Sequence, residues 1–269
     1  MTITDSIILG ILQGLTEFLP VSSSGHLVIV QYFMGMKSAA ENVTFDVMLH
    51  LATVLAVVWV YRSDLKNILS GKAVGDGADG IPGMKLLGFL LISLLATGII
   101  LPFKSGLEAH FETITGVRVF LLINALALAI LPRLRKGGKN LGQMNWTGAV
   151  IIGLAQAVGA FPGISRSGST IIAGLLLGLS PRDACRYSFL LSIPTILVAT
   201  IVQIPDAIRQ EIVFQPVNIF FGFLFALAAG LVAIPLLVGL VEKGKLWGFA
   251  VYCAIVGLAL FFPFPESIS

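Results

Sequence analysis

Two polar clusters interrupt long apolar stretches of this sequence, and the first combines a carboxylate, an imidazole and several hydroxyls. Its polar and turn-forming residues are, in chain order, Gln13, Glu17, Pro20, Ser22, Ser23, Ser24, Gly25 and His26. Gln13 and Glu17 are four residues apart and therefore lie on one face of a helix that Pro20 must end. The serines and Gly25 then begin a second helix, whose unpaired backbone N–H groups and positive dipole end favour an anion.

The second cluster adds a guanidinium group to the same kind of helix start. Its candidate phosphate ligands are Ser165, Arg166, Ser167, Gly168 and Thr170. A guanidinium can hold two phosphate oxygens at once. Together the clusters predict a receptor for a phosphate anion. Glu17, with Gln13 beside it, would hold a divalent cation such as Mg²⁺, which favours one or two carboxylates plus substrate phosphate oxygens.

The composition predicts that both clusters lie inside a membrane. The chain has 269 residues, of which 57% are hydrophobic and 12% charged, and its mean hydropathy is +0.97. Soluble domains contain about 25% charged residues and could not cover this much apolar surface. The net charge of +3 reflects a scarcity of charges, so no nucleic-acid partner is expected. A charged side chain at the bilayer centre costs at least about 2.5–3.5 kcal/mol, so Glu17 and Arg166 are candidates for function.

The apolar segments predict an all-α polytopic membrane protein. Six of them are suited to full transmembrane helices, namely 44–62, 84–103, 116–132, 184–204, 217–240 and 246–264. Regions 3–35 and 147–180 are each too long for one span and each is interrupted by one of the polar clusters. We expect both to be re-entrant pairs of broken helices, because irregular backbone at membrane depth must line a cavity or be buried in protein.

An internal repeat relates the two interrupted regions. When Gly10–Ile29 is placed over Gly153–Ile172 without gaps, seven of twenty positions are identical. Three full spans separate the copies, so the second copy would be inverted relative to the first. The chain is therefore expected to form a single membrane domain of two repeats, approximately 3–132 and 147–264.

The distribution of basic residues predicts the orientation. Loops on one side of the membrane carry twelve Lys and Arg residues, and loops on the other side carry four. Because Lys and Arg are enriched in cytoplasmic loops, the side with twelve is predicted to be cytoplasmic. Region 3–35 would then enter the membrane from outside and region 147–180 from the cytoplasm.

The two clusters resemble the signature regions of a known family. QGLTEFLPVSSSGHL (Gln13–Leu27) and PGISRSGST (Pro162–Thr170) are similar to those of bacterial undecaprenyl pyrophosphate phosphatases, the BacA/UppP family, and the resemblance extends over the whole chain. It implies an integral-membrane hydrolase that removes the terminal phosphate of the C55 isoprenyl pyrophosphate carrier. This reaction recycles the carrier for cell-wall synthesis and requires a divalent cation, Mg²⁺ or another such as Ca²⁺.

The resemblance also assigns residues and a location. It implies that Ser23, His26 and Arg166 are essential, and it places the family motif (E/Q)xxxE on Gln13 and Glu17. Since this chain has the glutamine form, Glu17 is left as the charged ligand. The implied location is the bacterial cytoplasmic (inner) membrane, with the site open to the extracytoplasmic side.

Several alternatives stay open at this point. His26 could be the nucleophile, or the general base for water or for Ser23, while Arg166 and the helix ends neutralise the developing charge. Asp46 and His50, four residues apart, could lie at the membrane interface or support the site. The rival function is an inverted-repeat transporter or flippase for a lipid phosphate or another anion.

Glycine pairs leave the assembly open as well. Gly10 and Gly14, and likewise Gly174 and Gly178, have the spacing of small residues that let membrane helices approach closely. Packing within the chain is the favoured interpretation, and contact within a homodimer is the alternative.

Overall fold

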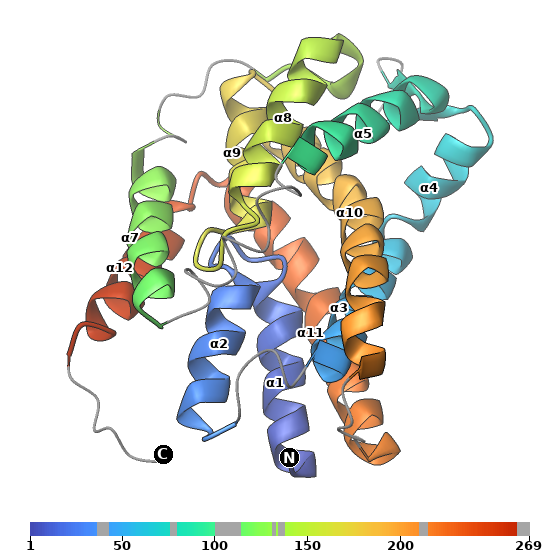
Figure 1. The fold of residues 1–269 in the computed structure, drawn as a ribbon. Coiled ribbons are helices and arrows are strands. Elements are labelled where there is room, and N and C mark those ends of the chain that lie inside the picture. Colours follow the sequence, from blue (N-terminus) through green and yellow to red (C-terminus); the bar gives the residue numbers. More distant parts are fainter. Residues whose placement is uncertain are drawn as a thin grey trace.

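The computed structural model of this chain is built almost entirely of α-helices (Figure 1). It describes residues 1–36, 43–75, 80–99, 114–130, 133, 138–209 and 215–262. The elements are α1 (Ile3–Thr16), α2 (Ser23–Phe33), α3 (Val43–Val60), α4 (Arg62–Leu69), β1 (Ala73–Val74), β2 (Ile81–Pro82), α5 (Gly83–Thr97), α7 (Ile114–Ile130), the 3-10 turn η4 (Leu141–Gln143), α8 (Trp146–Val158), α9 (Arg166–Leu176), α10 (Pro181–Arg209), α11 (Pro216–Glu242) and α12 (Trp247–Ala259).

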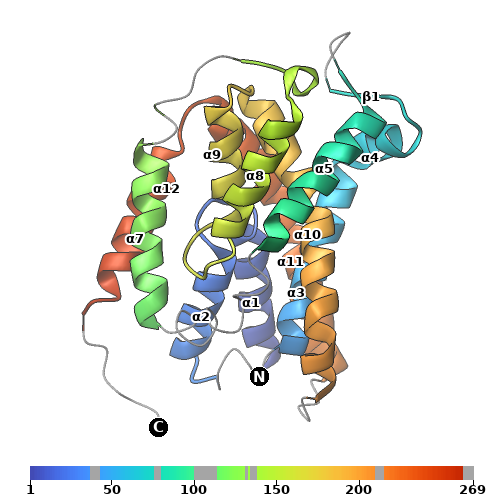
Figure 2. The ribbon, with the colours of Figure 1, turned by 45° about the horizontal axis from the view of Figure 1, so that its top comes forward.

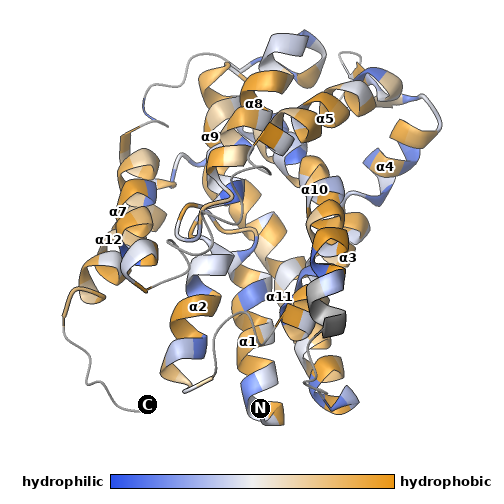
Figure 3. Ribbon diagram, in the orientation of Figure 1, coloured by the Kyte–Doolittle hydropathy of each residue, from blue (hydrophilic) through white to orange (hydrophobic). Residues whose placement is uncertain are grey.

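The length and composition of the helices are those of a membrane protein. Three of them, α3, α10 and α11, are long and apolar enough to cross a bilayer. They coincide with the predicted spans 44–62, 184–204 and 217–240. Figure 3 shows hydrophobic residues along most of the helices, with hydrophilic residues gathered at α4 and its flanking loop.

The other three predicted spans correspond to shorter apolar helices. They contain α5, α7 and α12, each of which has fewer than 18 residues. Part of every one of these three predicted spans lies outside the described residues. The chain is therefore an α-helical membrane protein, and the number of its full spans stays a prediction.

The two interrupted regions fold into helix pairs with equivalent boundaries. A spacing of 143 residues separates the first residue of α1, Ile3, from that of α8, Trp146. The same spacing separates α2 from α9 at both ends. It is also the offset at which the repeated segments align, so the sequence repeat corresponds to a repeat of structure. We use the term tips for the two connections, 17–22 between α1 and α2 and 159–165 between α8 and α9.

The tips meet near the middle of the molecule, approaching from opposite sides (Figures 1 and 2). A Cβ atom added to Gly25, at the start of α2, would come within 3.0 Å of the Gly163 backbone in the other tip. One added to Gly168, at the start of α9, would come within 3.1 Å of Pro20. Gly25 is equivalent to Gly168 in the repeat, and Pro20 to Gly163, so each contact is the counterpart of the other with the copies exchanged.

Close helix packing explains the small residues of α1. A Cβ atom on Gly10 or Gly14 would collide with the backbone carbonyl groups of Gly222 and Ala226 in α11. Gly174 of α9 likewise packs against Ala184 of α10. These glycines are covered by helices of the same chain, which agrees with the favoured interpretation that they serve packing within the chain. A homodimer stays a prediction without support from them.

The basic loop after α3 contains elements that the sequence analysis did not predict. It folds into α4 and an antiparallel pair in which Ala73 lies opposite Pro82 and Val74 opposite Ile81. Arg186 of α10 anchors α4 by donating to Asp64 at 3.1 Å, and it also donates to Asp183 at 3.0 Å. The N-terminal end of α10 is therefore linked to α4.

Candidate active site

Glu17 lies at the centre of the site, at the C-terminal end of α1. Its side chain is 6% exposed. The Oε2 atom accepts hydrogen bonds from Gln13 Nε2 at 2.9 Å and from Ser23 Oγ at 2.7 Å. The predicted common face of Gln13 and Glu17 is thus confirmed, and Ser23 reaches the same oxygen from the next helix. The carboxylate is held in one orientation by two donors from its own repeat.

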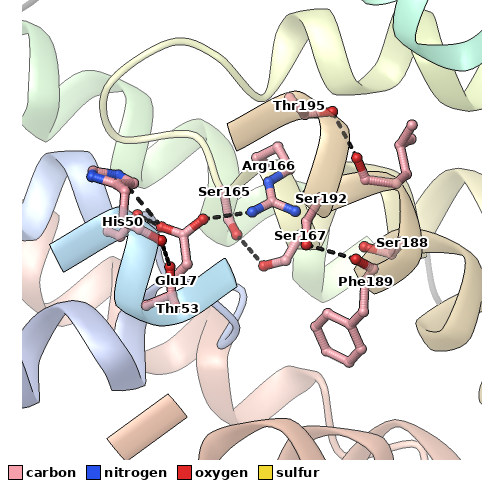
Figure 4. Close-up of polar contacts among 12 residues, drawn as sticks. Glu17, His50, Thr53, Ser165, Arg166, Ser167, Ser188, Phe189, Ser192 and Thr195 are labelled. Carbon is pink, nitrogen blue, oxygen red and sulfur yellow. Dashed lines mark hydrogen bonds and ion pairs between the residues drawn. The ribbon is translucent and has the colours of Figure 1, made fainter. Parts of the chain in front are cut away.

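Arg166, from the second repeat, completes the pairing of this carboxylate. Its Nη2 donates to Glu17 Oε1 at 2.5 Å, although 149 positions separate the two residues in the chain. Figure 4 shows Glu17 between Arg166 and His50. The Nη1 atom of Arg166 is buried and has no hydrogen-bond partner among the described residues. The guanidinium therefore keeps one donor group for a ligand.

Three of the predicted phosphate ligands, Ser22, Ser24 and Gly25, lie at the start of α2. Ser22 caps the helix with a φ of 72°, which is uncommon for a residue other than glycine. Its Oγ accepts from Gly25 N at 3.3 Å and from Gly163 N at 2.9 Å, and these bonds stabilise this conformation. Ser23 is the first helical residue, while Ser24 is exposed and its Oγ lies 3.5 Å from that of Ser22.

The start of α9 repeats this arrangement around Arg166. Ser165 caps the helix by accepting from Gly168 N at 3.0 Å, and its Oγ lies 3.0 Å from Ser167 Oγ. Thr170 is turned toward α10, where its Oγ1 lies 2.6 Å from Ser188 Oγ. The positive ends of two helix dipoles therefore converge on Glu17 and Arg166, and an anion could be stabilised between them.

His26 lies one turn into α2, and both of its ring nitrogens have partners away from Glu17. Nδ1 lies 2.7 Å from the carbonyl oxygen of Ser22, and Nε2 lies 2.9 Å from the hydroxyl of Tyr252 in α12. A carbonyl oxygen can only accept, so Nδ1 carries a proton. In the neutral ring, Nε2 then accepts from Tyr252.

A second imidazole, that of His50, faces the carboxylate from α3. Nε2 of His50 lies 3.7 Å from Glu17 Oε2, and Nδ1 lies 2.7 Å from the carbonyl oxygen of Asp46. The Asp46 carboxylate accepts from Gln31 Nε2 at 3.0 Å. Of the two interpretations that the sequence left open for Asp46 and His50, this geometry favours support of the site for His50.

Two residues near the site were missed by the sequence analysis. Asn124 of α7 hydrogen-bonds to both tips, and Tyr252 of α12 hydrogen-bonds to His26. Each is a polar side chain within an apolar helix, which is the signal that could have identified them.

Gln13 and Glu17 have oxygen atoms that suit a divalent cation. Gln13 Oε1 is buried and has no hydrogen-bond partner among the described residues. Each carboxylate oxygen has two lone pairs, and Glu17 Oε1 accepts one described hydrogen bond, that from Arg166. Two oxygen atoms of adjacent side chains therefore have unused lone pairs, as a hard cation requires. Gln13 and Glu17 therefore have the donor atoms that the predicted cation would need.

Over nearly its whole length the chain is similar to a known family and to named relatives. The family model described as "Bacitracin resistance protein BacA" matches residues 6–259. The chain is 39% identical over 273 residues to the undecaprenyl-diphosphatase of Methanobrevibacter smithii, covering 97% of both chains. It is 39% identical over 262 residues to that of Halothermothrix orenii, again covering 97% of both. It is 36% identical to undecaprenyl-diphosphatase 1 of Shouchella clausii, covering 97% of this chain and 96% of the relative.

Proposed function

The chain belongs to the family of the bacitracin resistance protein BacA, and on that premise we propose how its site hydrolyses undecaprenyl diphosphate. The products are undecaprenyl phosphate, which is recycled as a lipid carrier for cell-wall synthesis, and inorganic phosphate. The observation that carries the proposal is the joining of Ser23 and Arg166, both partly buried, to the buried Glu17 carboxylate. Relatives over nearly the whole chain are phosphatases by name, so hydrolysis is favoured over the transporter alternative.

Ser23 is the proposed nucleophile and Glu17 the group that accepts its proton. The 2.7 Å hydrogen bond from Ser23 Oγ to Glu17 Oε2 has the geometry needed for this transfer. Oγ attacks the terminal phosphorus, the bond from that phosphorus to the bridging oxygen breaks, and undecaprenyl phosphate leaves. Water then attacks the phosphoserine and its atoms leave with the inorganic phosphate, while Glu17 returns its proton to Ser23 Oγ, which restores the hydroxyl and the carboxylate.

His26 receives a supporting role in this mechanism. Its hydrogen bonds to the Ser22 carbonyl and to Tyr252 occupy both ring nitrogens, so neither is directed at Ser23. The sequence left His26 open as the nucleophile or as the base for water or for Ser23, and it assigned Glu17 to the cation. The geometry favours Glu17, not His26, as the base for Ser23. His26 would hold the start of α2 in place through the Ser22 carbonyl.

Negative charge develops on the transferred phosphoryl group, and the site offers positive groups to stabilise it. Arg166 Nη1 is the buried donor that is free for a phosphate oxygen. The starts of α2 and α9 add backbone N–H groups and dipole ends from two directions. The hydroxyls of Ser22, Ser24, Ser165, Ser167 and Thr170 remain predicted phosphate ligands.

Gln13 and Glu17 would hold the divalent cation, Mg²⁺ or another such as Ca²⁺. A bound cation would neutralise part of the charge on the pyrophosphate. The unused lone pairs on Gln13 Oε1 and Glu17 Oε1 support this assignment.

The proposed architecture has six full transmembrane helices and two re-entrant pairs, α1–α2 and α8–α9, in an inverted repeat. The exchanged contacts of Gly25 with Gly163 and of Gly168 with Pro20 support it. We place the protein in the bacterial inner membrane, with membrane lipid around it and the site open to the extracytoplasmic side. The bias of twelve basic residues against four supports this orientation.

The test is phosphate release from a C15 or C55 isoprenyl pyrophosphate by the purified protein in detergent, with Mg²⁺ and with EDTA. We expect release by the wild type to require the cation. Glu17→Gln and Arg166→Lys should each reduce kcat by about 10²–10³-fold, because each removes a charge-assisted contact at the reacting group.

The matched controls are Glu242→Gln and Arg182→Lys. These residues also form an Arg–Glu pair, with 2.9 Å between Arg182 Nε and Glu242 Oε1, but their side chains are 57% and 39% exposed, and they lie on α10 and α11. Both controls should retain nearly all of the activity, since exposed pairs contribute little. Equal losses in the two sets, or no release by folded wild type with several prenyl lengths and cations, would contradict the proposal.

A further inference from the structure

The helices α7 and α12 pack side by side at one edge of the molecule, next to the two tips (Figures 1 and 2). Both helices are apolar, yet each directs one hydrogen-bonding side chain toward the site. Asn124 does so from α7 and Tyr252 from α12. The proposed mechanism gives Asn124 no role and involves Tyr252 only as a hydrogen-bond partner of His26.

Asn124 forms a bridge between the two tips. Its side chain is buried, and Nδ2 donates to the carbonyl oxygen of Pro20 at 2.9 Å. Its Oδ1 accepts from the backbone N–H of Ser165 at 3.3 Å. One amide thus bonds to the first tip with its donor end and to the second tip with its acceptor end.

The bridge lies close in sequence to both charged groups of the site. Pro20 follows Glu17 by three residues, and Ser165 directly precedes Arg166. A change in the separation of the tips would therefore change the distance between Glu17 and Arg166. An asparagine suits this position because its side chain is a donor and an acceptor at once, whereas an ionised aspartate only accepts and a leucine does neither.

Tyr252 acts on a different group, the ring of His26. Its hydroxyl lies 2.9 Å from His26 Nε2, and the two rings are stacked with centroids 5.6 Å apart and an interplanar angle of 12°. Because Nδ1 donates to the Ser22 carbonyl, the tyrosine hydroxyl favours the neutral tautomer with its proton on Nδ1. The start of α2, where Ser23 lies, is held through this chain of hydrogen bonds.

We propose that α7 and α12 position the active site through Asn124, which sets the separation of the tips, and Tyr252, which orients His26. Both are positioning residues, since they reach the reacting groups through Pro20, Ser165 and His26. This inference rests on the proposed phosphatase function, so the wild type is assayed alongside every variant.

Asn124→Ala is tested against Asn218→Ala, which removes an equivalent amide elsewhere. Asn218 of α11 is also buried, and it also donates to a backbone carbonyl, that of Met1, at 2.9 Å. Both variants should lower the thermal midpoint, Asn124→Ala by more, because its amide bonds to two backbone groups and that of Asn218 to one. Only Asn124→Ala should lower kcat, on the order of 10²-fold with little change in KM, because small displacements of reacting groups cost that much.

A double variant separates positioning from general destabilisation. If Asn124 acts by placing Arg166, then adding Asn124→Ala to Arg166→Lys should cost much less than it costs in the wild type. Full multiplication of the two losses would overturn this role. So would equal kcat values for Asn124→Ala and Asn218→Ala while the wild type remains active.

Tyr252→Phe removes the hydroxyl and keeps the stacked ring. We expect kcat to fall about tenfold, the size of one hydrogen bond, while the exposed Tyr32→Phe should have no effect. NMR of ¹⁵N-labelled histidine rings should show His26 as the Nδ1–H tautomer in both proteins, because the Ser22 carbonyl is kept, and should show a shifted Nε2 signal in Tyr252→Phe, because Nε2 loses its hydrogen bond. A variant missing His26 assigns the signal.

The Nε2 measurement does not depend on activity. An inactive wild type with the expected Nε2 shift would count against the phosphatase function and support the contact of Tyr252 with His26. An active wild type with an unchanged Nε2 signal in Tyr252→Phe would overturn the role of Tyr252 and leave the function intact.

Discussion

Glu17 illustrates how one residue can receive its chemistry from several helices. Its carboxylate accepts from Gln13 and Ser23 on one oxygen and from Arg166 on the other. The short contact with Ser23 places Glu17 within reach of the hydroxyl proton in the proposed mechanism, and Arg166 compensates the negative charge of the buried carboxylate. His50 adds a second imidazole at 3.7 Å, a distance too long for a direct hydrogen bond.

The role of Ser23 leads to a prediction at this scale. Ser23→Ala should lower kcat by about 10²–10⁴-fold, because the nucleophile and its proton transfer are both lost. Mass spectrometry of acid-quenched wild type in the presence of substrate should find a phosphoryl group on the peptide that contains Ser23.

Ser24→Ala is the matched control for this experiment. Ser24 is the next residue, but its hydroxyl is exposed and lies 3.5 Å from Ser22 Oγ, with no described contact to Glu17. It should lose far less activity and keep the phosphorylated peptide. A phosphoryl group on His26, or single-turnover ¹⁸O transfer from water without any covalent species, would contradict the role of Ser23.

At the scale of elements, glycine decides how closely the helices can approach. The first repeat places Gly10 of α1 against the backbone of α11, and the second places Gly153 of α8 against Ser93 of α5. The same sequence position thus makes a close helix contact in both repeats. This packing fixes α1, and with it the location of Glu17.

We predict that Gly10→Ala destabilises the protein by about 1–3 kcal/mol, because the added methyl group would overlap the Gly222 carbonyl and force the helices apart. Thermal unfolding in detergent measures the effect. Gly239→Ala, in α11, is the control: a Cβ atom there meets nothing within 4 Å, and alanine gains up to about 1 kcal/mol of helix propensity. Equal midpoints for the two variants would be incompatible with the packing of α1 on α11.

At the scale of the whole molecule, the two repeats approach the site from opposite sides. Each supplies a half that the other lacks, since Glu17 belongs to the first repeat and Arg166 to the second. The alignment places Ser23 opposite Arg166 and Glu17 opposite Ala160. The two copies therefore have equivalent helix bounds but carry different functional groups at equivalent positions.

The proposed orientation predicts the accessibility of two exposed positions, Lys72 near β1 and Gln215 before α11. In intact cells, a membrane-impermeant maleimide should modify Gln215→Cys and should modify Lys72→Cys only after permeabilisation. The natural thiols Cys185 and Cys253 are buried and should contribute little background. Labelling of Lys72→Cys in intact cells, with Gln215→Cys protected, would reverse the orientation.

Much of the fold was predictable because it depends on local properties of the chain. Apolar length predicted the positions of α3, α10 and α11 within a few residues. Pro20 and the serines predicted the end of α1 and the start of α2, since proline stops a helix and serine caps one. The 143-residue offset of the repeat predicted the equivalence of α2 and α9.

The partners of the site residues could not be predicted, because they depend on contacts between distant segments. Spacing placed Gln13 beside Glu17, but only the tertiary structure shows that Ser23 binds the same carboxylate. Arg166 reaches that carboxylate because the two tips meet. The partner of His26 Nε2 is Tyr252, which lies 226 positions away. Asn124 is an ordinary polar residue in its own helix, and it gains its importance from lying where both tips leave a backbone group without a helical partner.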